Sequence, residues 1–120
     1  MRVIIAGSRS ITDYPIVVNA IANSRFNISE VICGMARGVD SQGLRYAITN
    51  GIPYRKFPAD WNRYGRSAGH RRNKQMADNA DALILVWDGV SHGSANMLEI
   101  ANSKGLKVYQ VVVEAQDGGR

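Results

Sequence analysis

Short apolar runs alternate with segments of helical periodicity along nearly the whole chain. The apolar runs predict five β-strands, over Arg2–Ala6, Glu30–Cys33, Pro53–Phe57, Ala82–Trp87 and Lys107–Val113. Between them, apolar residues spaced three or four apart predict four helices, from Asp13 to about Ser24, Val39 to about Thr49, His70 to about Asn79 and Ser94 to about Lys104. The apolar residues from Pro58 to Gly69 have no regular spacing, so this stretch is interpreted as a loop. Loops of this length in a compact domain more often have a function than not.

Regular strand–helix alternation predicts an α/β fold, with a parallel sheet of about five strands and helices on both faces. We expect one domain over residues 1–113 and a frayed tail over 114–120. Because right-handed crossovers place the strand-to-helix turns at the C-terminal edge of the sheet, the turns should converge on one crevice.

Three of these turns are rich in glycine and polar residues: Gly7-Ser8-Arg9, Gly34–Asp40 and Asp88–Ser94. Glycine lets the backbone approach a ligand closely, and the free N–H groups at a helix start favour anions such as phosphate. Three such turns in one small domain indicate a nucleotide-type ligand. The candidate ligand-binding residues in them are Gly7, Ser8, Arg9, Gly34, Arg37, Gly38, Asp40, Asp88, Gly93 and Ser94.

Two residues of the second turn have an alternative, purely structural interpretation. Asp40 lies in the first turn of a predicted helix, where a carboxylate suits the helix dipole without any ligand. Arg37 could clamp a phosphate or pair with Asp40, and the sequence does not separate these roles.

The composition is that of an ordinary globular protein, with 45% hydrophobic and 21% charged residues among 120. The chain has a single cysteine, Cys33, inside a predicted strand, where we expect a buried small hydrophobe. No apolar run approaches the length of a membrane span or a signal peptide, so we expect a cytoplasmic protein without a membrane partner.

The net charge of +5 is concentrated in one segment, Arg55–Lys74. Asp60 is the sole acid there, against Arg55, Lys56, Arg63, Arg66, Arg71, Arg72 and Lys74. Such a segment fits a phosphate-bearing partner, and the interleaved Trp61, Tyr64 and His70 suit stacking on bases; the alternative is a solvated basic loop.

Two consecutive arginines, Arg71 and Arg72, stand at the start of the third predicted helix. Cations in a first helical turn oppose the macrodipole, so a bound anion would explain them better than helix stability does. Asn73 follows them as a hydrogen-bonding candidate.

The sequence shows no metal-ligand spacing and no Walker or strict dinucleotide fingerprint, and we expect no metal or cofactor. Glu99, on the fourth predicted helix, is either solvated or a general base or ribose ligand that projects into the crevice.

The motifs also resemble those of a known family. They are Val3–Arg9, Gly34–Asp40, Phe57–Trp61, Gly69–Met76, Trp87–Gly89 and Gly93–Glu99. In order and content they resemble the small YspA-like branch of the SLOG superfamily, which groups the Smf/DprA DNA-processing proteins with the Lonely-guy phosphoribohydrolases. The resemblance implies a Rossmann-like three-layer fold that binds nucleotides or nucleotide-derived molecules in the crevice, and a role in sensing or sequestering a signalling nucleotide.

The relatives point to two further functions. Gly34–Asp40 is similar to the glycine-rich loop of DprA-type proteins, which bind single-stranded DNA, and the Arg55–Lys74 segment would serve such binding. Arg72–Met76 is similar to the Arg-Lys-x-x-Met element of the phosphoribohydrolases, whose arginine is catalytic, although Asn73 replaces the lysine. An N-glycosidic hydrolase would use Arg72 and Glu99, but the place of the family's glutamate is taken here by Met97. Relatives often dimerise, so a homo-oligomer is also expected.

Overall fold

The computed structural model describes residues 1–114, so most of the predicted frayed tail lies outside the described residues. All five predicted strands are present, as β1 (Arg2–Gly7), β2 (Glu30–Cys33), β3 (Tyr54–Lys56), β4 (Ala82–Trp87) and β5 (Lys107–Val112). They form one parallel sheet in the order β3-β2-β1-β4-β5. The predicted five-stranded parallel sheet is confirmed.

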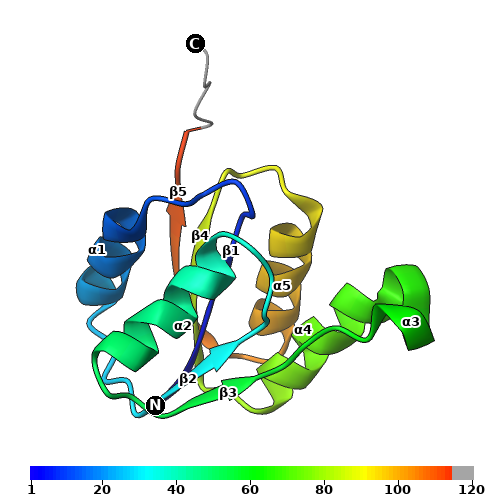
Figure 1. The fold of residues 1–120 in the computed structure, drawn as a ribbon, viewed down its shortest axis with the longest axis horizontal. Coiled ribbons are helices and arrows are strands. Elements are labelled where there is room, and N and C mark those ends of the chain that lie inside the picture. The colour runs from blue at the N-terminus through cyan, green and yellow to red at the C-terminus, as the bar shows by residue number, and fades with distance from the viewer. Residues whose placement is uncertain (115–120) are drawn as a thin grey trace.

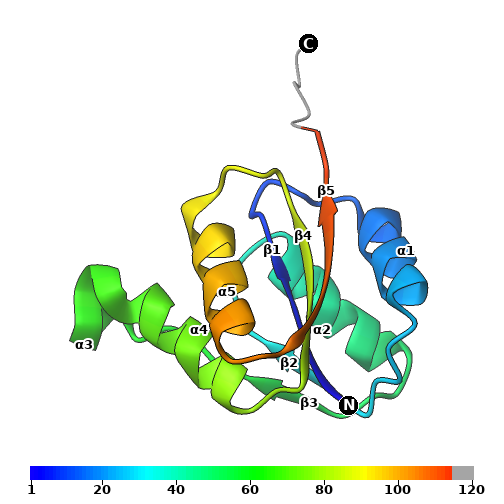
Figure 2. The same cartoon turned by 180° about the vertical axis from the view of Figure 1, so that it is seen from behind.

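Two helical layers cover the sheet because successive side chains of a strand point to opposite faces. On β1, Val3 and Ile5 face one apolar cluster and Ile4 and Ala6 face the other. The helices α1 (Tyr14–Ser24) and α2 (Val39–Thr49) pack on the first face, whereas α4 (Ala68–Asp78) and α5 (His92–Ser103) pack on the second, as Figures 1 and 2 show from opposite sides. The three-layer Rossmann-like fold is therefore confirmed. None of the helices in residues 1–114 is long and apolar enough to cross a membrane.

The predicted loop over 58–69 is wrong in part, because most of it is helical. A short helix α3 (Trp61–Tyr64) and a 3-10 turn η1 (Gly65–Ser67) lead directly into α4. The Asp60 carboxylate caps α3 by accepting the Arg63 N–H at 3.1 Å. No residue of α3 or η1 is buried, so this segment has no apolar period to reveal it in the sequence.

Two predicted helix starts also shift toward the N-terminus. Helix α4 begins at Ala68 rather than His70, and it continues from η1. Arg72 therefore lies in the second turn of α4, and the expected opposition between Arg72 and the start of the helix dipole is wrong. Helix α5 begins at His92, with Ser91 at its N-cap, so Ser94 is inside the first turn and does not start the helix.

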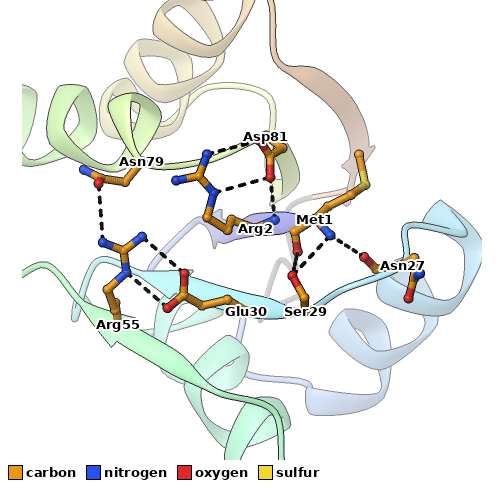
Figure 3. A network of polar contacts seen from close by, with 8 residues as sticks. All are labelled: Met1, Arg2, Asn27, Ser29, Glu30, Arg55, Asn79 and Asp81. Carbon is orange, nitrogen blue, oxygen red and sulfur yellow. Dashed lines mark hydrogen bonds and ion pairs between the residues drawn. The ribbon is translucent and has the colours of Figure 1, made fainter.

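A network of polar contacts holds the N-terminal edge of the sheet, opposite the glycine-rich turns (Figure 3). Asp81, just before β4, accepts the backbone N–H of Arg2 at 2.8 Å and pairs with its guanidinium at 3.3 Å. Arg55 of β3 forms an ion pair with Glu30 at 3.2 Å and donates to the Asn79 side chain. These contacts join the strand starts of β1, β2, β3 and β4.

We expect replacement of Asp81 by asparagine to change how stability depends on pH. The Arg2 backbone N–H, followed by its side chain, lowers the pKa of Asp81. A carboxyl whose folded pKa is lowered adds stability above its unfolded pKa of about 3.9, and the gain is lost as pH falls through the folded value. In urea unfolding, the wild type and Asp81→Asn should differ by a constant amount from pH 5 to 7 and converge toward pH 3. A gap independent of pH would contradict this assignment.

Candidate functional site

A cavity of about 550 Å³ opens at the C-terminal edge of the sheet. Residues from all three glycine-rich turns line it, together with residues of α3 and α4. They are Ala6, Gly7, Ser8, Arg9, Ser10, Ala36, Asp40, Trp61, Arg66, Gly69, His70, Arg72, Asn73, Asp88, Ser91, His92, Gly93, Ser94, Asn96 and Met97. The expectation that the turns converge on one crevice is confirmed.

The first turn is fixed by close backbone packing and one buried hydroxyl. A Cβ on Gly7 would lie 1.7 Å from the carbonyl oxygen of Val86, so only glycine fits where β1 ends beside β4. Ser8 is 2% exposed, and its hydroxyl accepts the Asp88 N–H at 3.0 Å and lies 3.1 Å from the Ser91 hydroxyl. Ser8 lines the cavity, but its hydroxyl is engaged in joining the first turn to the third.

The third turn is shaped by Asp88. Its carboxylate accepts the N–H groups of Val90 at 2.9 Å and Ser91 at 2.8 Å, and these two bonds lower the pKa of Asp88. The Ser91 side chain does not cap α5. Among residues 1–114, no protein acceptor is found for the N–H groups of His92, Gly93 or Ser94. The N-terminus of α5 thus offers three N–H donors and the positive end of its dipole beside the cavity.

The second turn brings together a buried carboxylate and a half-buried guanidinium. Asp40 is 5% exposed and accepts the Ala36 N–H at 3.3 Å. Burial raises the pKa of Asp40, while the charge of Arg72 and backbone hydrogen bonds act in the opposite direction. A Cβ on Gly34 would lie 2.7 Å from both the Asp40 carboxylate and the Arg72 guanidinium, so this glycine makes room for the two groups. Asp40 has a structural role here, and it also lines the cavity.

Arg72 is held from two sides. Its guanidinium donates to the carbonyl of Gly34 and to the Asn73 side-chain oxygen. Asn73, 7% exposed, in turn donates to Asn96 at 2.9 Å and to the carbonyl of Gly93 at 3.3 Å. Asn73 therefore ties α4 to the start of α5 and orients Arg72 at the cavity wall.

The basic segment Arg55–Lys74 does not form one continuous surface. Arg55 pairs with Glu30 at the opposite edge of the sheet (Figure 3). Arg71 stacks on the Tyr64 ring, 4.3 Å from its centroid, and donates to the Ser67 hydroxyl. Arg66 and Arg72 line the cavity. The local charge excess is thus divided among different parts of the molecule.

A second, smaller cavity of about 250 Å³ adjoins the first, and four residues line both. The lining residues are Arg9, Gly34, Met35, Ala36, Arg37, Pro58, Ala59, Trp61 and Arg72. Gly34 and Arg37 belong only to this second cavity. The remaining predicted site residues, Gly38, Arg71 and Glu99, line neither cavity. Glu99 is exposed, and Met97 reaches the larger cavity instead.

Several lining residues were not predicted from the sequence to bind a ligand: Ser10, Ser91, His92 and Asn96. Arg66 and His70, which also line the cavity, were expected only as members of the basic segment. Asn96 lies three residues after Gly93 on α5, so helical spacing alone could have placed both on one face. The basic segment pointed to Arg66 as a phosphate contact, but the sequence did not place Arg66 at the crevice because the helical character of α3 and η1 was not evident. Within residues 1–114, no group of three or more His, Cys, Asp and Glu side chains is arranged to hold a metal ion.

The fold and the position of the cavities define a doubly wound α/β protein with a ligand-sized crevice at the carboxyl ends of its strands. The model of the YspA, cpYpsA-related SLOG family matches residues 1–64, and the chain belongs to this family. The match spans β1 to α3 and thus includes the first two turns. No curated protein matches the sequence.

Among solved structures, the chain is similar to DNA processing protein A (DprA) from Streptococcus pneumoniae. The superposition has a TM-score of 0.76 at 18% sequence identity and covers 98% of this chain. It covers 52% of the DprA chain, so this protein spans about half the length of that structure. At this identity the likeness shows the fold alone.

Proposed function

We propose that this protein binds a nucleotide or a nucleotide-derived small molecule in the larger cavity. One observation carries the proposal: three N–H donors at the start of α5 and the Arg72 guanidinium belong to the same 550 Å³ cavity. Helix N-termini and arginine forks are two devices that proteins commonly use to hold phosphate. Such binding would serve to sense or sequester a signalling nucleotide.

The position of each lining residue in the larger cavity suggests which part of the nucleotide it would contact. Gly93 and Ser94, with His92, would hold the phosphate through backbone N–H groups, and Arg72 would add charge from α4. Arg9 and Arg66 would contribute at the rim. Trp61 is 51% exposed and lines the cavity, which suits stacking against a base.

We expect nucleoside 5′-monophosphates to bind more tightly than the matching nucleosides. The measurement is isothermal titration calorimetry at low salt with adenine, guanine, cytosine and uracil series. Loss of the phosphate should weaken binding by about 10-fold or more, since a hydrogen bond to a charged group contributes about 1.5–3 kcal/mol.

The same experiment can reject the proposal. Equal affinity for a nucleoside and its monophosphate would show that the phosphate is not held at α5. Absence of binding by every member of all four series would show that the cavity does not take a nucleotide.

Hydrolysis of a nucleoside monophosphate at its N-glycosidic bond is a second candidate function. The observation that favours it is a carboxylate with a raised pKa, Asp40, in the same cavity as Arg72. Glu99, the acid predicted from the sequence, is exposed outside the cavity. Incubation with the four monophosphates, followed by chromatography for free base, tests this reaction; the absence of base from all four would exclude it.

Binding of single-stranded nucleic acid is a weaker proposal, because the basic segment is divided between two edges of the molecule. The similar solved structure is that of a DNA-processing protein, and this likeness motivates a test with oligonucleotides of increasing length. A cytoplasmic location and a homodimer stay predictions. Met97 of α5 is 1% exposed within the chain, so its side chain is not available for contact with a second copy.

A further inference from the structure

The two cavities adjoin each other, and together they are called the groove. Arg9, Ala36, Trp61 and Arg72 line both of them, and their volumes are about 550 and 250 Å³. The α5 start belongs only to the larger cavity, and Arg37 belongs only to the smaller one. The groove therefore has two distinct ends.

The smaller cavity has an excess of positive charge, although the Asp40 carboxylate lies beside Gly34 and Arg72. Its lining includes the three arginines Arg9, Arg37 and Arg72 and no carboxylate. Burial and the charge of Arg9 both lower the pKa of Arg72, against the opposing influence of Asp40. Asp40 offsets part of this charge, and the remaining excess of positive charge favours a bound anion.

The rim of the smaller cavity carries a second, independent signal at Met35. This residue has a φ of 63°, in the left-handed region, and it is 42% exposed. A non-glycine residue in this conformation has a strained backbone, and such residues gather at ligand-binding sites. Met35 and the half-exposed Trp61 are both lining residues, so this basic cavity also offers apolar surface.

We propose that the smaller cavity is a subsite for a second phosphate, and that the ligand is a 5′-phosphorylated dinucleotide. The inference rests on the proposed function and extends it. The 5′-phosphate would lie at the start of α5, and the phosphodiester would lie between Arg9, Arg37 and Arg72. The first nucleoside spans the larger cavity, and the second base packs against Met35 and Trp61. The start of α5 lines only the larger cavity and Arg37 lines only the smaller one. A ligand that reaches both therefore needs two phosphates with a nucleoside between them.

The experiment compares four adenine probes by calorimetry: AMP, ADP, adenosine 3′,5′-bisphosphate and 5′-phosphorylated ApA, with guanine, cytosine and uracil sets in parallel. The bisphosphate and the dinucleotide should bind the wild type about 10-fold more tightly than AMP, whereas ADP should match AMP. The variant Arg37→Ala should remove this gain and leave AMP affinity within about twofold. Arg37 is exposed, so its replacement should not disturb folding.

A matched control variant is Arg45→Ala, which removes the same charge from α2. Arg45 stacks on Tyr14, 4.0 Å from the ring centroid, and lines neither cavity. It should leave all four affinities within about twofold, which separates a local contact of Arg37 from a general loss of positive charge.

Several results would overturn the inference while leaving the proposed function intact. In the first, the bisphosphate binds the wild type no more tightly than AMP does. In the second, ADP gains as much affinity over AMP as the bisphosphate does. In the third, Arg37→Ala weakens the binding of AMP and of the dinucleotide by the same factor. Affinity that keeps rising with tri- and hexanucleotides, with a steeper salt dependence, would instead show a single-strand binding surface. If no probe in any of the four sets binds the wild type, both the inference and the proposed function fail.

Discussion

Replacement of Gly38 by alanine is expected to lower the stability of the protein strongly. Among the glycines of the three turns, we expect a larger loss only at Gly7, which packs against β4. Gly38 has a φ of 71° and precedes α2 as its N-cap. A Cβ there would lie 2.3 Å from the carbonyl oxygen of Ser8 and 2.6 Å from that of Arg9. Both contacts are with backbone atoms, so the two turns would have to separate to admit the methyl group.

The expected loss combines two effects. A φ of 71° with a ψ of −127° costs an alanine about 1–3 kcal/mol, and overpacking against fixed atoms adds about 1–3 kcal/mol. A total of about 3–4 kcal/mol is a large share of the roughly 5–15 kcal/mol by which domains are usually stable. The free energy of unfolding, measured by urea titration followed by circular dichroism, should fall by that amount.

Gly51→Ala is the matched control for this variant. Gly51 also has a positive φ, of 64°, but a Cβ there would meet no atom within 4 Å. It should therefore lose only the conformational part, about 1 kcal/mol. Equal losses in the two variants would mean that the turns can separate freely and that the contact of Gly38 with Ser8 and Arg9 does not constrain the site.

Replacement of Arg72 by alanine is expected to have the largest effect on ligand binding. Its guanidinium lines both cavities and is oriented by the Gly34 carbonyl and the Asn73 side chain. Loss of a charge-assisted, oriented contact to phosphate removes about 1.5–3 kcal/mol, which corresponds to a roughly 10- to 100-fold rise in Kd. Calorimetry with the best-binding monophosphate is the measurement.

The adjacent Arg71 provides the control. It is exposed, stacks on Tyr64 and lines neither cavity, so Arg71→Ala should change Kd by less than about twofold. Comparable losses at positions 71 and 72 would show that net charge near α4, rather than an oriented guanidinium, governs binding.

Arg72→Ala also leaves Asp40 as a buried carboxylate without its nearby cation, and this lowers stability. Two further variants separate binding from folding. Arg72→Lys keeps the charge but not the forked geometry, and it should lose about 10-fold in affinity. The double variant Arg72→Ala/Asp40→Asn removes both charges and should recover stability without recovering affinity. Recovery of affinity in the double variant would contradict a direct role for Arg72.

Local sequence patterns predicted the strands of the sheet but did not predict the helical α3–η1 segment. This segment contributes Trp61 and Arg66 to the cavity wall. Ala82–Trp87 is an uninterrupted apolar run because β4 is buried on both faces. Such a run predicts a strand from the sequence alone, without knowledge of the strands beside it. The helix α3 buries none of its residues, so nothing in its sequence repeats at a helical period. The sequence therefore placed Trp61 and Arg66 on a loop, with Trp61 among the candidate ligand-binding residues.

The sequence by itself determined the alternation of strands and helices, the parallel sheet and the meeting of the glycine-rich turns at one edge. These follow from periodicity and from the handedness of the crossovers, which act on every chain of this pattern. Only the tertiary structure decided which side chains share the groove. It turned Arg72 toward Gly34 and Arg71 toward Tyr64, and it engaged the Ser8 hydroxyl with Asp88 and Ser91. The adjacent residues Arg71 and Arg72 thus point to different partners, whereas Ser8 contacts residues about 80 positions away in the sequence. Local patterns do not encode these contacts, because the direction of a side chain depends on how the helices and strands pack.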